Sequence, residues 1–231
     1  MGKLNIKKMK IVITVLLLLF LTLSVYSQEK IFIDEKGDTI SKDIYRKKWS
    51  NKDLLLSVWS HKDENGKIYY TLKKDLYLKG LINYDSIIKK LEKVTNKKFK
   101  NSNTLLIEYY FKDDLCTQNR NNKWSKSEIS SRKSYTTPIK KELEKKEIAM
   151  IVLFDNDIIL KNKPKRKNEY YYKDINNYFK NKFFKNPTTC GSFALIKPNG
   201  QYIIRNGEYR ADFMAQHLKT ENWKIFFNSE D

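Results

Sequence analysis

Four short apolar runs in the second half of the chain are typical of β-strands. They are residues 104–111 (TLLIEYYF), 148–154 (IAMIVLF), 192–196 (SFALI) and 201–205 (QYIIR). Helical patterns over residues 124–145 and 174–184 separate the first three runs, and Pro-Asn-Gly joins the last two as a tight hairpin. Strands that alternate with helices in this way predict an α/β layer structure with parallel central strands.

Two details complete this half of the chain. A last helix is predicted over residues 209–218, where Phe213, Met214 and Leu218 are available for packing. Pro138 lies inside the polar stretch 124–145, and its ring should kink that helix or split it.

The first half predicts a smaller unit of mixed α and β structure. The expected elements are a strand over 31–34, a helix over 42–49 with Ser41 as its N-cap, strands over 54–59 and 67–72, and an amphipathic helix over 83–94. Asn65-Gly66 lies between the second and third strands and is the clearest hairpin signal in the chain.

The amino terminus has the three parts of a secretory signal. Lysines precede an almost unbroken apolar stretch over residues 11–26, and Val25 and Ser27 stand at the positions that signal peptidase reads. The stretch is shorter than the roughly 20 residues that usually span a bilayer. We therefore expect residues 1–27 to be a cleavable signal peptide, and the rest to be exported without a membrane span, to the periplasm or beyond the cell. An uncleaved N-terminal anchor is the alternative.

The formal charge of +19 attracts anionic partners. Only six of the 46 basic residues are arginines, however, and specific readout of phosphates and bases favours arginine. The densest basic run, residues 163–167, is typical of a solvated loop. The charge therefore predicts no specific nucleic-acid partner. Binding to an acidic polymer of the cell envelope remains an alternative.

The order strand, helix, strand, helix, strand, strand, helix over residues 104–220 resembles the thioredoxin fold. Its most specific part is the stretch FALIKPNGQY over 193–202, which is similar to the hairpin before the last helix of thioredoxin-like proteins. The resemblance implies an α/β, thioredoxin-like C-terminal domain over 104–231, preceded by an N-terminal α+β extension over 28–103.

In that fold the active-site cysteines follow the first core strand, and a cis-proline loop precedes the third. Cys116 and Cys190 occupy these two places, so the resemblance implies that they meet, although 74 positions separate them. Two cysteines in an exported chain are a possible disulfide. A structural disulfide is the first interpretation, a redox-active pair split across two loops is the second, and two free thiols are the third.

The chain departs from the family at this site. Residues 114–119 read DLCTQN, without Cys-x-x-Cys, and Cys190-Gly191 stands where the family has its cis-proline. The resemblance therefore does not imply ordinary disulfide oxidoreductase activity. A redox pair would need solvent access and a stabilised thiolate, which Lys112 and the next helix N-terminus would favour and which Asp113 and Asp114 would oppose.

No other group of residues predicts a defined chemistry. Asp113 and Asp114, with Glu108 nearby, are candidates for an acid pair or cation ligands, but adjacent carboxylates at a strand end more often cap a helix or face water. His61 and His217 do not have the spacing of a metal pair. The sequence contains no nucleophile elbow and no phosphate-binding glycine loop, so we expect neither a metal nor a cofactor.

The tyrosines Tyr170, Tyr171 and Tyr172, with Trp124 and Trp223, are candidates for a surface that binds sugar or peptide, although we favour a role in covering the core edge. The function predicted from the sequence is therefore an exported, non-classical thioredoxin-like accessory or interaction module with a structural disulfide, rather than an enzyme. The alternatives are a thiol–disulfide oxidoreductase that uses the split pair, or an envelope module that binds a polyanion. The partner is accordingly an unidentified protein or such a polyanion.

Overall fold

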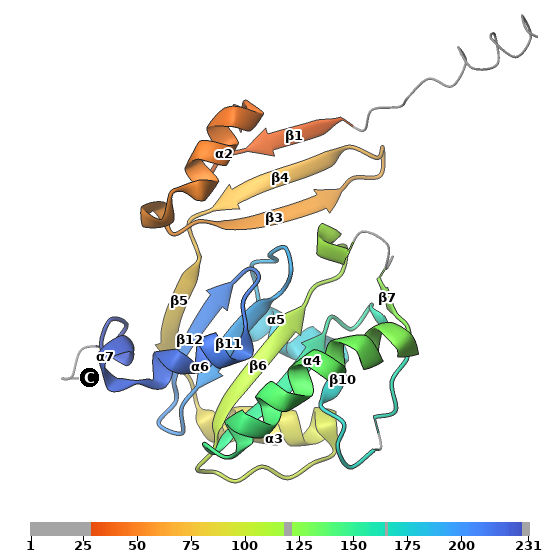
Figure 1. Ribbon diagram of the computed structural model, residues 1–231, viewed down its shortest axis with the longest axis vertical. Coiled ribbons are helices and arrows are strands. Elements are labelled where there is room, and N and C mark those ends of the chain that lie inside the picture. The colour runs from red at the N-terminus through yellow and green to blue at the C-terminus, as the bar shows by residue number, and fades with distance from the viewer. Residues whose placement is uncertain (1–28, 118–121, 165, 228–231) are drawn as a thin grey trace, which may run out of the picture.

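Two β-sheets organise the part of the chain that the computed structural model describes, residues 29–117, 122–164 and 166–227. The smaller sheet contains the N-terminal strands and lies at one end of the larger sheet, as Figure 1 shows. The predicted signal peptide, residues 1–27, lies outside the described residues.

The larger sheet has the strand order β10-β8-β6-β11-β12-β5. Its strands are β5 (Tyr77–Leu81), β6 (Thr104–Tyr110), β8 (Ile148–Phe154), β10 (Tyr171–Lys173), β11 (Ser192–Ile196) and β12 (Gln201–Asn206). β6, β8 and β10 are parallel, and β11, β12 and β5 follow in antiparallel pairs. The predicted parallel central strands and the hairpin between the last two apolar runs are confirmed.

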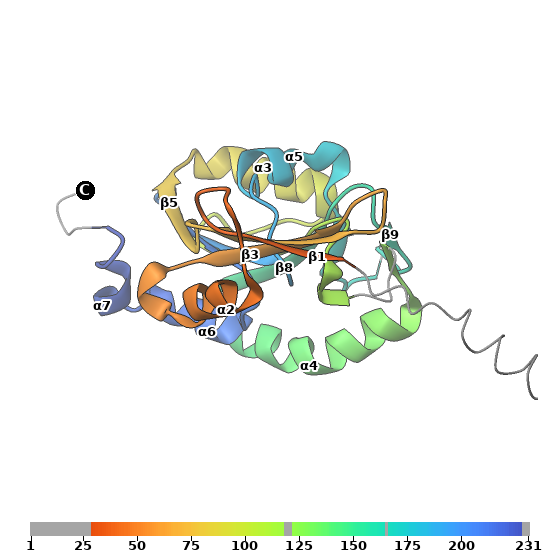
Figure 2. The ribbon, with the colours of Figure 1, turned by 90° about the horizontal axis from the view of Figure 1, so that it is seen from above.

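Helices cover both faces of this sheet, as Figure 2 shows. α3 (Tyr84–Thr95) and α5 (Tyr178–Lys182) lie on one face. α4 (Lys126–Glu144) and α6 (Ala211–Ala215) lie on the other, and α7 (Thr220–Trp223) follows near the C-terminal end of the described chain. The sheet is therefore the middle layer of three.

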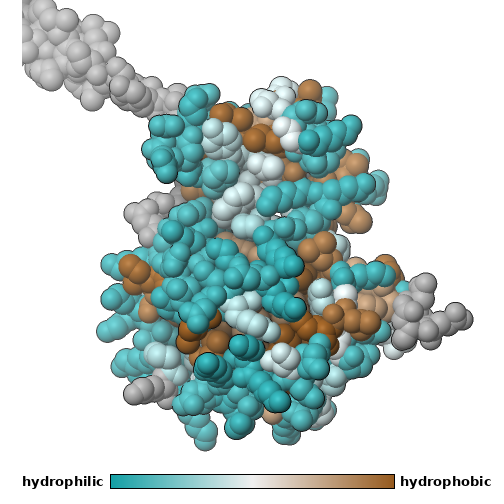
Figure 3. Space-filling model, turned by 180° about the vertical axis from the view of Figure 1, so that it is seen from behind, coloured by the Kyte–Doolittle hydropathy of each residue, from teal (hydrophilic) through white to brown (hydrophobic). Residues whose placement is uncertain are grey.

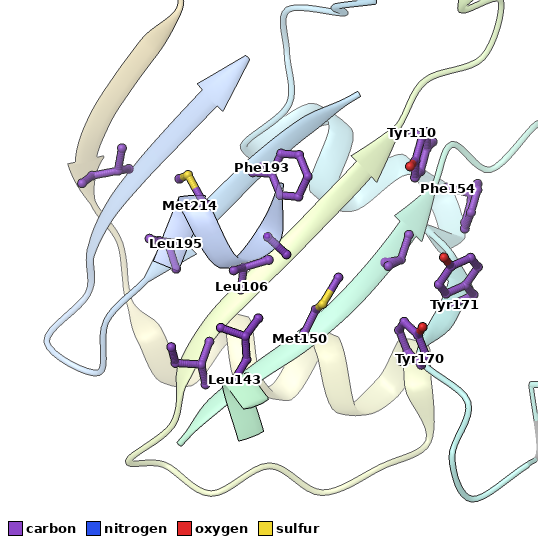
Figure 4. Close-up of a cluster of buried hydrophobic side chains, with 14 of the residues drawn as sticks. Leu106, Tyr110, Leu143, Met150, Phe154, Tyr170, Tyr171, Phe193, Leu195 and Met214 are labelled. Atoms are coloured by element: carbon purple, nitrogen blue, oxygen red, sulfur yellow. The ribbon is translucent and has the colours of Figure 1, made fainter. Parts of the chain in front are cut away.

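The alternation of side chains along each strand produces two separate cores, because successive residues point to opposite faces. In β6, Leu106 packs with residues of α4 and α6, whereas Leu105 and Ile107 pack with residues of α3 and α5. Figure 4 shows the first cluster, in which Met214 of α6 lies beside Phe193 and Leu195 of β11. Continuous apolar runs such as 148–154 are what a sheet buried on both faces requires.

The smaller sheet has the order β2-β1-β4-β3 and is covered by one helix. Its elements are β1 (Lys30–Ile33), β2 (Thr39–Ile40), β3 (Ser57–Lys62), β4 (Ile68–Lys73) and α2 (Lys42–Ser50). The predicted hairpin through Asn65-Gly66 joins β3 to β4 in antiparallel register. The predicted N-cap is also confirmed, since the Ser41 hydroxyl accepts the N–H of Ile44 at 3.3 Å.

Several predicted boundaries need correction. The strand expected over 54–59 starts only at Ser57, because Lys52–Leu54 form a 3₁₀ turn and Leu55 is left-handed with φ 48°. The helix expected over 174–184 is a 3₁₀ turn over Ile175–Asn177 followed by the short α5, and the break falls where Asn176 and Asn177 have positive φ. The helix over 209–218 is likewise shorter, as α6 and a 3₁₀ turn over Gln216–Leu218.

Pro138 does not split its helix. α4 continues through it from Lys126 to Glu144 and follows a bowed path along the sheet in Figure 2. A proline inside a helix removes one hydrogen bond. Ile129 and Leu143 are both buried against the core on either side of that position, which holds the two halves on the same sheet face.

The larger sheet includes residues on both sides of the predicted boundary at 103/104. β5 pairs with β12, and α3 packs on the sheet through Ile87 and Leu91. The two sheets separate instead between Lys73 and Tyr77, where β4 ends and β5 begins. A two-stranded parallel pair, β7 (Lys123–Trp124) and β9 (Ile159–Leu160), completes the strands of the described chain. Hydrophilic residues cover most of the face seen in Figure 3, with apolar residues in smaller areas between them.

Candidate functional site

The two cysteines meet where the chain leaves β6 and enters β11. Cys116 lies in a 3₁₀ turn, Leu115–Thr117, after β6, and Cys190 lies two residues before β11. β6 and β11 are antiparallel neighbours, with Tyr109 opposite Ser192, so the end of one strand lies beside the start of the other. The cysteines form a disulfide with a Cα–Cα distance of 5.0 Å. The two cysteines are therefore adjacent, as predicted.

The carboxylate of Asp114 holds both halves of this disulfide. One oxygen accepts the backbone N–H of Cys116 at 2.8 Å, and the other accepts the N–H of Cys190 at 2.8 Å. This arrangement links the two loops at the same point as the S–S bond. It also places a negative charge beside both cysteines, and a nearby negative charge disfavours a thiolate.

The helix and the lysine that were expected to favour a Cys116 thiolate have other partners. α4 begins only at Lys126, and its first turn is closed by a capping box between Ser125 and Glu128. A helix N-terminus stabilises an anion only over its first turn. The ammonium of Lys112 lies 3.9 Å from the Asp157 carboxylate. The expected favourable partners of a Cys116 thiolate are therefore directed elsewhere.

The backbone at Cys190 and Gly191 adopts a sharp left-handed turn. Their φ angles are 67° and 85°. A Cβ on Gly191 would come within 2.6 Å of the Tyr109 carbonyl oxygen, so only glycine fits there. Cys190 and Gly191 stand where thioredoxin-like proteins have a cis-proline. The described part of the chain contains no cis peptide.

A chain of buried polar side chains runs from this turn to the link between the sheets. The Thr188 hydroxyl is 2.8 Å from that of Ser192, and Ser192 donates to the Asn206 side chain at 2.9 Å. Asn206 in turn donates to the Asp75 carbonyl at 2.6 Å, and the Asp75 carboxylate accepts the Ser57 hydroxyl. The sequence reasoning missed these residues. The one available signal was a polar residue at each end of the β11–β12 hairpin.

The loop that carries Cys190 also supports the N-terminal sheet. Thr189 donates its N–H to the Val58 carbonyl at 2.8 Å, and its hydroxyl accepts the N–H of Ser60 at 2.8 Å. The Lys73 ammonium donates to the Pro187 carbonyl at 3.0 Å, and burial lowers the pKa of that lysine. Loop 187–191 is thus attached through the disulfide to the 3₁₀ turn after β6, and through hydrogen bonds to β3.

The candidate acid pair does not form. Glu108 is buried, accepts the Tyr110 hydroxyl at 2.6 Å and pairs with Arg132 at 3.0 Å. Asp113 accepts the side-chain amide of Asn122 at 2.6 Å, and Asp114 binds the two cysteine amides. Each carboxylate thus has its own structural partners, which leaves no shared acid and base.

The remaining candidates belong to the core. Tyr170, Tyr171 and Tyr172 are buried, as are Trp124 and Trp223, so the suggested sugar- or peptide-binding surface is absent and the core-edge interpretation is confirmed.

The two histidines lie in different places. His61 stacks between Trp59 and Tyr69, whereas His217 packs against Tyr77 and Phe226. Within the described ranges, no three His, Cys, Asp or Glu side chains are grouped to hold a metal ion.

Comparison with known proteins gives little further information. No protein-family model matches the chain, and no curated protein does. Among solved structures, the exposed lipoprotein thioredoxin Etrx1 of Streptococcus pneumoniae strain TIGR4 is similar over 71% of this chain and 98% of its own, with 11% identity and a TM-score of 0.31. A likeness at that level is too weak to carry a conclusion.

The fold class rests on strand order and direction instead. β8 and β6 are parallel, joined by α4, and β11 and β12 form the antiparallel hairpin beside β6 that precedes α6. This is the arrangement that the resemblance implied. The chain therefore has a mixed α/β structure with a distant thioredoxin-like fold in its larger sheet.

Proposed function

We propose that this protein is an exported accessory module with a thioredoxin-like fold, in which the Cys116–Cys190 disulfide is structural. The observation that carries the proposal is the Asp114 carboxylate, which binds the backbone amides of both cysteines. A thiol–disulfide enzyme needs its attacking sulfur as a thiolate. A carboxylate bound to the backbone of both cysteines opposes that state, while it links the two loops.

Export is supported by the amino-terminal pattern and by the disulfide together. Disulfides persist in oxidising compartments and are rare in the reducing cytosol. Among the described residues, no helix has the length and apolar character needed to cross a membrane.

The competing function is thiol–disulfide exchange through the split pair. The observation that favours it is the exposure of Cys116 at the protein surface, where another thiol can reach its sulfur. In such a reaction a partner thiolate would attack one sulfur and release the other cysteine as a thiolate, beside Asp114.

Two assays separate the functions. The structural disulfide should stay oxidised in a thiol buffer poised at about −270 mV, the potential of thioredoxin. The protein should also fail to accelerate insulin reduction by dithiothreitol. Half-reduction at that potential together with insulin turnover would establish the oxidoreductase.

A substitution tests the role of Asp114 directly. In the reduced protein, Asp114→Asn should speed alkylation of Cys116 by iodoacetamide at neutral pH severalfold, because the neighbouring negative charge is gone. Asp113→Asn is the matched control, since Asp113 bonds to Asn122 rather than to either cysteine. Equal rates in wild type and Asp114→Asn would remove the electrostatic basis of the proposal.

A further inference from the structure

A groove of about 670 Å³ lies between the N-terminal sheet and the end of β12, beside Cys190. In Figure 1, α2 lies above the end of β12, on the side of the molecule that also carries α6. One wall of the groove comes from residues 30–76, the segment that precedes the larger sheet. The other wall comes from Thr189–Cys190 and residues 205–208. Its size falls in the range of about 300–1,000 Å³ that ligand sites occupy.

Basic side chains dominate the charge of this groove. They are Lys30, Lys42, Arg46, Lys52 and Arg205, against the acidic Glu208. None of the five forms an ion pair with another residue in the described part of the chain, whereas Lys48 on the same helix is paired with Asp34 and Glu35. The positive charge of the groove is thus not neutralised by ion pairs within the described chain.

The two arginines face the groove from its two walls. Arginine is scarce in this chain, yet Arg46 of α2 and Arg205 of β12 both line this one groove. Arg205 is held in place, because its Nη1 donates to the Glu208 carbonyl at 2.8 Å and its guanidinium lies over the Tyr209 ring at 3.7 Å. Its Nε is buried without a hydrogen-bond partner. Arginine is the residue best suited to bind carboxylates through paired hydrogen bonds.

The groove is also apolar. Trp49 and Leu55 line it with 55% and 51% of their surfaces exposed. Leu55 has a left-handed backbone, φ 48°, which is uncommon for a non-glycine residue. Beneath them, Phe32 stacks on Tyr70 at 5.3 Å and packs against Tyr45 at 5.1 Å. Exposed tryptophan beside arginine is the composition of binding hot spots.

From these features we propose that the groove binds an acidic segment of a partner protein that carries both carboxylates and apolar side chains. This inference rests on the proposed role as an interaction module and names the chemistry of its partner. Carboxylates would pair with Arg46 and Arg205, and apolar side chains would cover Trp49 and Leu55. A uniformly charged polyanion would leave that apolar wall in water, which makes it the poorer occupant.

The test uses the intact mature protein and a phage-displayed library of random 12-residue peptides. The expected result is enrichment of peptides that mix Asp or Glu with aromatic or aliphatic residues. Synthetic copies of the enriched peptides should then bind at least tenfold more weakly to Arg46→Glu and to Trp49→Ala, as measured by fluorescence anisotropy. Both residues are exposed, so neither change disturbs the core.

Matched controls carry the same changes at exposed positions outside the groove. Arg166→Glu and Ile225→Ala should alter the affinity less than twofold. No enrichment, enrichment of basic peptides, or equal losses in variants and controls would overturn the inference. Enrichment of acidic peptides without apolar residues would also overturn it and would favour a polyanion. These results are independent of insulin turnover, so the proposed function and this inference can fail separately.

Discussion

The two sheets of this protein differ in how their strands are buried. The larger sheet is covered on both faces, and β6, β8 and β11 are buried along nearly their whole length. The cluster under α2 in the N-terminal sheet has three buried members among the described residues, Tyr45, Leu56 and Leu72. Because apolar burial contributes roughly 25 cal/mol per Å², the larger sheet supplies most of the stability.

The smaller sheet therefore depends on its attachment. β3 is held by Thr189, β4 by the Lys73–Pro187 contact, and the link to β5 by the Ser57–Asp75 bond. All three contacts lead to the loop before β11 or to the buried polar chain beside it. The difference teaches that the larger sheet is stabilised by its own two cores, whereas the smaller sheet depends on contacts with the larger one. Four predictions probe this division.

Removing the disulfide has the largest expected effect. The double variant Cys116→Ser, Cys190→Ser opens a 74-residue loop, for which the chain-entropy model gives a loss of about 4.5 kcal/mol. Urea denaturation should show a fall in the free energy of unfolding of up to this size. The single variant Cys116→Ser should lose as much, and a fall below about 1 kcal/mol would contradict a structural role.

Two core truncations come next and address the comparison directly. Ile107 and Leu72 are almost fully hidden, so replacing either with alanine should cost about 3 kcal/mol. Ile107→Ala should lower the stability of the whole protein, whereas Leu72→Ala should loosen the N-terminal sheet alone. Hydrogen exchange resolved by segment distinguishes these outcomes. Global destabilisation by Leu72→Ala would show that the two sheets unfold as one unit.

The capping box of α4 gives a smaller effect. Ser125→Ala removes the hydroxyl that accepts the Glu128 N–H at 3.3 Å and should cost about 1 kcal/mol in thermal or urea denaturation. Ser130→Ala is the control, because Ser130 is exposed within the same helix. Equal stability of the two variants would mean that the cap contributes nothing.

The smallest effect is a pH dependence at the N-terminal sheet. A hydrogen bond from Lys48 lowers the pKa of Asp34 from 3.8 to about 2. The stabilisation is therefore complete above the ordinary pKa and is lost as the pH falls through the folded value. Asp34→Asn should flatten the acid limb of thermal stability between these pH values, whereas Asp43→Asn, at an exposed position of α2, should leave it unchanged. If Asp34→Asn kept the acid limb of the wild type, the Lys48–Asp34 ion pair would not contribute to stability.

The meeting of Cys116 and Cys190 was predictable only through the resemblance to the thioredoxin fold, which implied that the strands beside them are neighbours. Once residues 104–111 and 192–196 are neighbouring strands of one sheet, the loops at their common end must approach each other. The N-cap Ser41 was equally readable, since it is a local polar residue before a helical pattern.

Other features depend on contacts between distant residues and could not be read locally. β5 contains Gly80, over which the Tyr202 side chain lies so closely that a Cβ would meet its hydroxyl at 2.6 Å. No local sequence pattern predicts that β5 pairs with β12, because the two strands lie far apart in the chain. The same holds for the polar chain through Ser192 and Asn206, and for the groove, whose two arginines lie far apart in the chain.

The central claim is that the Cys116–Cys190 bond holds the loop on which the N-terminal sheet rests. Amide hydrogen exchange before and after reduction tests it most directly. Reduction should speed exchange at Ser60 and Thr189, whose N–H groups join β3 to the loop, while Ile107 and Ala194 in the larger sheet stay protected. Unchanged protection at Ser60 and Thr189 would contradict the claim.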